Sequence, residues 1–284
     1  MFFGFWAGSA TNSVSPVDRF AFQLGSFSVT WYGLCVAAGF WLGAWTAARR
    51  APRAGIRADT VWDLLWVLIV AGIVGARVLY VATYWERDFK NEPLSEVFMV
   101  HHGGLVFHGG FIGAALSGFV WCRLKKVPGW RMADILAPGL ALGHAIGRIG
   151  CLINGCCYGR RCELPWSIRY PGSYGLPEGR LHPTQMYETL LGLALAAGLA
   201  WWFGRRKFEG QVFALYLLAY AVIRSFVELF RGDYPASAVT FGFLTPAHWV
   251  SLGLFVLGTV LYLILRRGPA PPAFPTASMN SDPA

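Results

Sequence analysis

The sequence predicts an all-α integral membrane protein with seven transmembrane helices. Hydrophobic residues make up 55% of the 284 residues and charged residues only 14%, whereas a soluble domain has about 25% charged residues. The mean hydropathy is +0.46. Seven apolar runs are each long enough to cross the hydrocarbon layer, which takes about 20 residues of helix. The chain length leaves room for one membrane domain and little else.

The predicted spans occupy residues 28–48, 60–82, 105–122, 133–154, 185–203, 211–230 and 246–265, within a seven-span membrane domain at 28–267. Residues 1–27 lack the charged start of a signal peptide, and we expect them to lie along the membrane interface. The connection at about 155–184 is rich in Gly, Pro and aromatic residues and predicts a small ordered cap. Residues 268–284 are rich in Pro, Ala and Ser and predict a disordered tail.

Lysine and arginine are distributed unevenly between the connections. The connections after the first, third, fifth and seventh spans hold thirteen of them, and those on the opposite side hold eight. The richer side is expected to be cytoplasmic. The N-terminus is then outside, the C-terminus cytoplasmic and the cap outside. The excess of Lys and Arg in the cytoplasmic connections explains the net charge of +9. No motif for binding nucleic acid accompanies this charge.

The polar residues inside the predicted spans gather toward the outer end of the membrane. They include Tyr32, Arg77, His108, Arg148 and Asn154. Four more polar residues repeat at the spacing i, i+4, i+8 and i+11, which predicts one face of a helix: Tyr220, Arg224, Glu228 and Arg231. We expect every strongly polar intramembrane group to lie in the outer half of the bilayer.

Arginine inside a membrane needs a partner. Three buried arginines would together cost about 8–10 kcal/mol on insertion scales, more than one carboxylate such as Glu228 could easily offset. A phosphate would offset this cost, because guanidinium groups bind phosphate oxygens in a bidentate manner. The pattern therefore predicts a pocket for a phospholipid headgroup. Structural pairing of Arg148 and Arg224 with Glu228 or Glu188 is an alternative, as is a transporter or channel for an anionic solute.

His108 stands between two glycine pairs in the segment HHGGLVFHGG. Glycine pairs permit close helix packing or an unwound backbone beside a cavity. A histidine in a polar site can act as a general base. The alternative is a packed histidine at the membrane interface.

Four of the six cysteines form a cluster with the spacing C-x4-C-C-x4-C: Cys151, Cys156, Cys157 and Cys162. This spacing matches no common zinc pattern, and adjacent cysteines rarely bind one ion, so no metal is expected. A disulfide and small apolar packing remain as alternatives.

Five motifs in order resemble the prolipoprotein diacylglyceryl transferase family from about Pro16 to Arg267. They are WYG at 31–33, FHGG at 107–110, GRIGCLINGCCYGR at 147–160, HPTQMYE at 182–188 and RSFVELFR at 224–231. One common form of the third motif has Asn and Glu where this chain has Cys151 and Cys156.

The resemblance implies an enzyme of the bacterial inner membrane whose active site faces the periplasmic leaflet. Its partners would be phosphatidylglycerol, other membrane lipid and a preprolipoprotein signal peptide with a lipobox cysteine. Diacylglyceryl transfer to the thiol would make a thioether and release glycerol phosphate, with no cofactor. The expected catalytic residues are His108, Arg148, Tyr220, Arg224 and Glu228. The expected substrate-binding residues are Tyr32, Arg77, Arg148, Asn154, Gly159 and Arg224.

Overall fold

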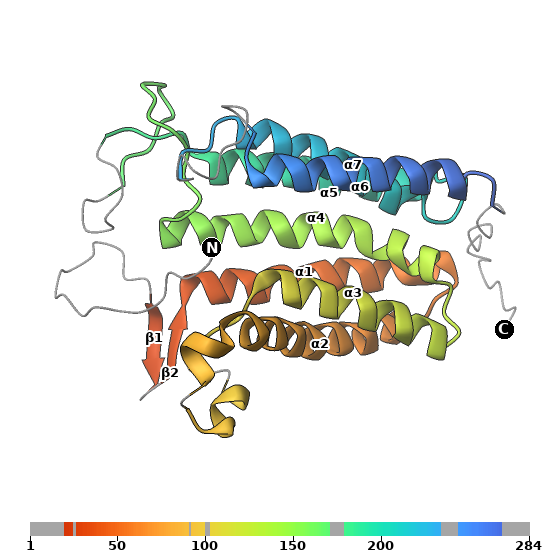
Figure 1. Cartoon of the computed structure of the whole chain (residues 1–284). Coiled ribbons are helices and arrows are strands. Elements are labelled where there is room, and N and C mark those ends of the chain that lie inside the picture. Colours follow the sequence, from red (N-terminus) through yellow and green to blue (C-terminus); the bar gives the residue numbers. More distant parts are fainter. Residues whose placement is uncertain are drawn as a thin grey trace, which may run out of the picture. The chain divides into compact units, whose positions relative to one another are not determined.

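The structure is a computed structural model that describes residues 20–24, 27–90, 92–99, 103–170, 179–233 and 244–268. These residues contain seven long helices, each on one predicted apolar run: α1 (Trp31–Arg50), α2 (Ala58–Tyr84), α3 (Phe107–Leu124), α4 (Gly129–Asn154), α5 (Thr184–Phe203), α6 (Gln211–Glu228) and α7 (Pro246–Leu265) (Figure 1). Five of them, α2 and α4 to α7, are long and apolar enough to cross a membrane. The prediction of a helical membrane protein is confirmed, and the count of seven spans stays a prediction.

A short β-hairpin precedes the first helix. The prediction of an all-α fold did not include this hairpin. Strands β1 (Phe20–Leu24) and β2 (Phe27–Thr30) pair antiparallel. The helix begins only at Trp31, because Thr30 is extended and its hydroxyl accepts a hydrogen bond from Gly33 N at 3.1 Å. The predicted start of the first span at residue 28 is therefore three residues too early. Most of the predicted interfacial segment, and all but the first residue of the predicted tail, lie outside the described residues.

The described residues form two compact units. Residues 59–129 make the first, which holds α2, the π-helix η2 (Trp85–Phe89), the 3-10 helix η3 (Leu94–Phe98) and α3. The second holds the hairpin, α1, the 3-10 helix η1 (Ala51–Ala54) and α4 to α7. Within the second unit, α6 packs against both α5 and α7.

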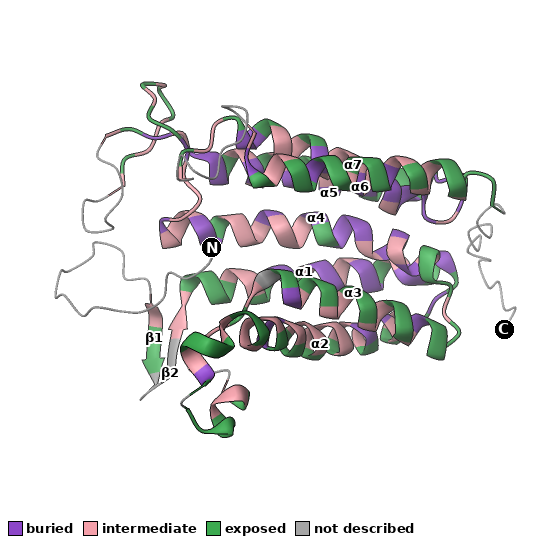
Figure 2. Cartoon of the chain, in the orientation of Figure 1, coloured by how far each residue is buried: buried purple, intermediate pink, exposed green. Residues whose placement is uncertain are grey.

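The pattern of burial differs from that of a soluble protein. Large apolar side chains are exposed along whole helices, such as Trp249, Leu252 and Phe255 of α7 (Figure 2). Several charged side chains are instead buried, including Arg77, Asp134, Glu188 and Glu228. In water, such a surface would form an apolar patch that promotes aggregation, whereas lipid chains solvate it without cost.

Glycine contacts bring helices together inside each unit. In the second unit, Gly39 and Gly43 of α1 face Gly143 and Gly139 of α4, and a Cβ on Gly43 would stand 2.8 Å from Gly139 O. In the first unit, Gly72 and Gly75 of α2 face glycines 109, 110 and 113 of α3. Small residues let helix backbones approach closely where lipid provides no hydrophobic drive. Of the two alternatives for the glycine pair after His108, close helix packing is the one present.

Replacing Gly139 with leucine is expected to lower the free energy of unfolding by about 1–3 kcal/mol, the usual cost of overpacking. The reason is that a Cβ at this position would meet Gly43 O at 2.5 Å, a backbone atom that cannot rotate away. Thermal unfolding in detergent measures the effect. Gly198→Leu on α5 is the matched control, because a Cβ there meets no atom within 4 Å. Equal melting of the two variants would contradict the close contact of α1 with α4.

Polar groups are not confined to one end of the helices, and this corrects the expectation that all lie in the outer half. Asp134 is completely buried in α4, about 21 Å along the helix from Arg148. Its carboxylate accepts hydrogen bonds from Gly210 N at 2.8 Å and Phe213 N at 3.0 Å. The first amides of a helix lack internal partners, and α6 has no side-chain cap of its own. An acid from a neighbouring helix therefore supplies the cap.

Candidate active site

A buried arginine–glutamate pair joins α4 to α5. Arg148 Nη2 donates to Glu188 Oε1 at 3.0 Å. Arg148 Nε lies 2.9 Å from Glu188 Oε2, close enough for an ion pair but without hydrogen-bond geometry. His144 Nε2 lies 3.0 Å from the same Oε1 atom. His144 and Arg148 are one helical turn apart on α4, so both side chains reach Glu188 from one face.

A second arginine–glutamate pair lies on α6 and connects it to α7. Arg224 Nη1 lies 2.6 Å from Glu228 Oε2, one turn along the helix. Glu228 Oε1 accepts a hydrogen bond of 2.6 Å from the Thr245 hydroxyl. Thr245 is also the N-cap of α7, in a capping box with His248. The completely buried Glu228 side chain therefore holds Arg224 and the start of α7 at once.

The two pairs belong to one polar cluster. The Tyr220 ring of α6 meets the His144 ring of α4 edge-on at a centroid distance of 5.2 Å, and Tyr220 lies one helical turn before Arg224. The fold thus brings together four predicted residues, namely Arg148, Tyr220, Arg224 and Glu228. The site residues expected from the sequence do not include His144, and Glu188 appears there as a possible partner of the arginines. The position of His144, four residues before Arg148, was the signal that could have placed it in the site.

These contacts correct the charge argument made from the sequence. Each of the two arginines already has a buried carboxylate partner, so their burial by itself does not require a phosphate. The alternative of structural pairing is realised in this structure. Arg148 is nevertheless only partly engaged: within the described chain its Nη1 makes one long contact, 3.9 Å to Cys151 Sγ. A guanidinium oriented on one side by a carboxylate can still bind an anion on its other side.

Arg231 does not share the helical face predicted for it. Helix α6 ends at Glu228, and Arg231 instead pairs with Gly159 in an isolated β-bridge. Its guanidinium forms a bidentate pair with Asp233, at 2.7 Å for both bonds. The i, i+11 spacing failed because the chain leaves the helix to meet the cap.

The described part of the segment predicted as a cap is held by a small network of backbone bonds around Gly159. Gly159 N donates to His182 O at 3.0 Å, and Arg160 N donates to Phe230 O at 2.8 Å. A Cβ on Gly159 would stand 2.7 Å from Phe230 O, so a side chain has no room here. Burial and the nearby Arg160 charge lower the pKa of His182. His182 Nδ1 lies 3.2 Å from the Tyr187 hydroxyl, within hydrogen-bond distance.

Two other predicted residues lie beside the C-terminal end of α4. Tyr32, in the first turn of α1, packs against Gly150, where an added Cβ would meet the Tyr32 ring at 3.1 Å. Asn154 is the last residue of α4 and is half-buried. Substrate binding by Tyr32, Asn154 and Gly159 stays a prediction.

His108 and Arg77 belong to the first unit. His108 is exposed in the first turn of α3. Arg77 is buried, and its guanidinium donates to the backbone carbonyls of Val97 at 2.9 Å, Gly103 at 2.7 Å and Gly104 at 3.1 Å. Both glycines have left-handed φ angles, +91° and +75°. Arg77 therefore organises the loop that leads to His108, and substrate binding by Arg77 stays a prediction.

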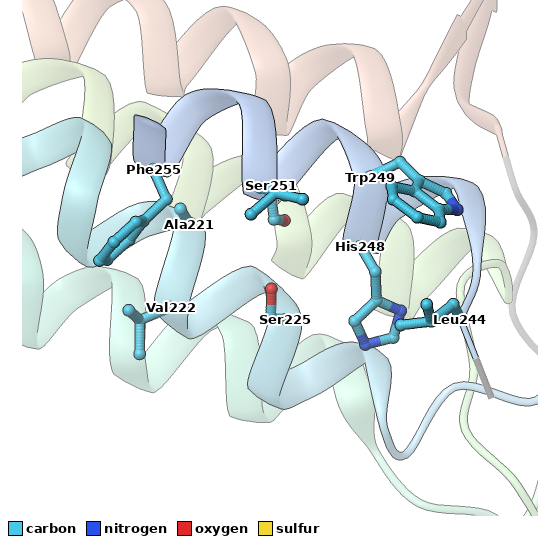
Figure 3. A pocket seen from close by; sticks show the side chains of 9 residues that line it. Ala221, Val222, Ser225, Leu244, His248, Trp249, Ser251 and Phe255 are labelled. Carbon is cyan, nitrogen blue, oxygen red and sulfur yellow. The ribbon is translucent and has the colours of Figure 1, made fainter. Parts of the chain in front are cut away.

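An apolar cavity of about 400 Å³ lies between α6 and α7. Figure 3 shows Ser225 of α6 and Ser251 of α7 between the two helices, with His248 and Trp249 toward the start of α7. Ser225 directly follows Arg224 in the chain. The cavity thus adjoins the segment of α6 that carries the Arg224–Glu228 pair.

Known proteins resemble this chain over most of its length. The family model for prolipoprotein diacylglyceryl transferase matches residues 19–264. A phosphatidylglycerol–prolipoprotein diacylglyceryl transferase of Finegoldia magna is 35% identical over 88% of this chain and 97% of its own length. Proteins of the same name from Gloeobacter violaceus and Clostridioides difficile are 38% and 34% identical, over 86% and 88% of this chain and 92% and 96% of their own lengths. The chain therefore belongs to the prolipoprotein diacylglyceryl transferase family.

Proposed function

We propose that this protein transfers the diacylglyceryl group of phosphatidylglycerol to the lipobox cysteine thiol of a preprolipoprotein. The products are a thioether and glycerol phosphate. The observation that carries the proposal is the family match over residues 19–264, together with relatives of that name that align with nearly their whole length. The transporter alternative finds no support in the family or in the relatives' names.

The thiol must be activated for this reaction. A free cysteine has a pKa of about 8.5 and is a weak nucleophile at neutral pH. In the proposed reaction His108 takes the thiol proton, the sulfur forms a bond to the glycerol carbon, and the bond from that carbon to the phosphate oxygen breaks. The electron pair of the broken bond leaves with glycerol phosphate. No metal or nucleotide takes part.

Arg148 and Arg224 are proposed to hold the phosphate that leaves. Glu188 and Glu228 orient the two guanidiniums, each through an ion pair shorter than 3 Å. Side chains of both arginines are at most 13% exposed, and charge stabilisation is stronger where water is excluded. Tyr220 contacts His144 of the same cluster and is proposed to complete the headgroup site.

The acyl chains need an apolar surface beside the headgroup site. The cavity between α6 and α7 has this character, with Ala221, Val222, Leu252 and Phe255 among its lining residues. We assign it to one acyl chain of the lipid. Pockets of a few hundred Å³ are the usual size for small ligands.

The proposed enzyme lies in the bacterial inner membrane with seven spans and with its active site toward the periplasmic leaflet. The support is the excess of Lys and Arg in alternate connections, which predicts a periplasmic N-terminus and a cytoplasmic C-terminus. In this orientation Arg148 and Arg224 lie near the periplasmic ends of α4 and α6. The lipobox cysteine of an exported protein reaches this side.

Reconstitution tests the proposed function. Purified protein in vesicles with phosphatidylglycerol and a lipobox peptide is expected to yield a diacylglyceryl peptide and glycerol phosphate in equal amounts, measured by mass spectrometry. A peptide with serine in place of the lipobox cysteine is the matched control and is expected to stay unmodified. Vesicles of phosphatidylcholine alone should give no product. Absence of the thioether with the cysteine peptide would overturn the proposal.

A further inference from the structure

Three cysteines that the proposed reaction does not use converge at the end of α4. Cys151 lies in the last turn of the helix, and Cys156 and Cys157 follow in the turn after it. Their three sulfur atoms all lie within 4.8 Å of one another. Cys162, the fourth cysteine of the sequence cluster, is not a member of this group.

The backbone is shaped to bring the adjacent cysteines together. Neighbouring side chains of an extended chain point to opposite sides. Cys157 instead has a left-handed φ of +63°, which few residues other than glycine adopt, and Gly155 has a φ of +69°. Strained conformations of this kind persist only where surrounding contacts hold them.

Two side chains from the start of α5 hold this turn. Gln185 Nε2 donates to Cys156 O at 2.6 Å, and the Thr184 hydroxyl donates to Cys157 O at 2.7 Å. Both side chains are buried. The turn is therefore fixed by tertiary contacts, and the sulfur atoms have a preformed arrangement.

We propose that Cys151, Cys156 and Cys157 form a binding site for a soft, thiolate-seeking metal ion. Thiolates select ions such as Zn²⁺ and Cu⁺ over Mg²⁺ and Ca²⁺. A tetrahedral zinc site with Zn–S bonds of 2.3 Å has sulfur atoms about 3.8 Å apart, so a small inward movement of the three side chains completes it. Each thiol loses its proton to solvent on binding. Three protein ligands leave the fourth position open.

The site gives the proposed transfer reaction a means of inhibition, an inference that rests on the proposed function. Three thiolates and one divalent ion carry a net charge of −1, where three neutral thiols carry none. Arg148 Nη1 lies 3.9 Å from Cys151 Sγ, so this negative charge forms beside the guanidinium assigned to the lipid phosphate. Metal binding is therefore expected to raise the apparent KM for phosphatidylglycerol. An increase of about 10-fold is typical of the coupling between two binding sites.

Cadmium titration tests the site without reference to activity. The full-length protein in detergent is reduced with a phosphine, freed of reductant and titrated with Cd²⁺. The expected result is one Cd²⁺ per chain, with the ultraviolet band of a cadmium–thiolate bond. Cys156→Ala is expected to lose most of this band, and Cys162→Ala, the matched control from the same segment, is expected to keep it. Equal loss in both variants, or no band in the parent protein, would overturn the proposal.

Alkylation of the protein without substitutions tests the site even if a cysteine variant does not fold. Bound Cd²⁺ or Zn²⁺ is expected to protect Cys151, Cys156 and Cys157 from a thiol reagent, and Mg²⁺ at equal concentration is expected to give no protection. If two of the three thiols form a disulfide again after reduction, even with Cd²⁺ present, the proposed site is wrong. The transfer assay with and without Cd²⁺ then tests inhibition separately: protection without a change in KM removes only the regulatory consequence.

Discussion

Replacing Arg148 with alanine is expected to lower turnover by about 10²–10³-fold, as loss of one group that stabilises transition-state charge does. In the described chain, the Arg148 guanidinium contacts Glu188 through Nη2 and Cys151 through Nη1. The proposed phosphate would meet it on the side away from Glu188. The measurement is the rate of thioether formation at saturating phosphatidylglycerol.

The substitution also removes the arginine partner of Glu188 and leaves it only His144, and breaking a buried ion pair costs about 3–5 kcal/mol. Arg148→Lys retains a positive charge for Glu188 and loses the two-nitrogen fork, so it separates folding from catalysis. We expect this variant to melt near the parent protein and to remain strongly impaired. Arg205→Ala, in the connection after α5, removes an exposed arginine and is expected to leave turnover unchanged. Near-normal activity of Arg148→Ala would show that Arg148 does not bind the lipid phosphate.

Replacing His108 with alanine is expected to lower turnover by about 10²–10⁴-fold, the usual contribution of a general base. Because only the neutral form of a base accepts a proton, the pH–rate profile of the variant should differ in shape from that of the parent protein. The profile distinguishes a base from a residue that only packs in the first turn of α3.

His182→Ala serves as the control for His108, because His182 contacts Tyr187 and the backbone of the cap. It is expected to lower stability and to leave the shape of the pH–rate profile unchanged. An unchanged rate and profile in His108→Ala would favour the alternative in which the positive field of the arginines alone activates the thiol.

The helices follow from the sequence because their causes are local. Each lies on an apolar run of the sequence, and its boundaries agree with the prediction to within four residues. The sequence indicated close helix contacts only around His108. Glycine pairs permit close packing, but they do not show which helix is the partner. The hairpin before Trp31 was missed because four or five residues of strand leave no clear signal beside a membrane span.

The sequence by itself determined the membrane character, the order of the helices and, through five motifs, the family. Only the tertiary structure decided which charges meet: Arg148 with Glu188, Arg224 with Glu228, and Asp134 with the start of α6. The first and third of these contacts join different helices, 40 or more residues apart in the chain. The physical reason is that hydropathy reports the solvent around each helix, whereas a buried charge takes its partner from whichever neighbour packing brings within about 3 Å.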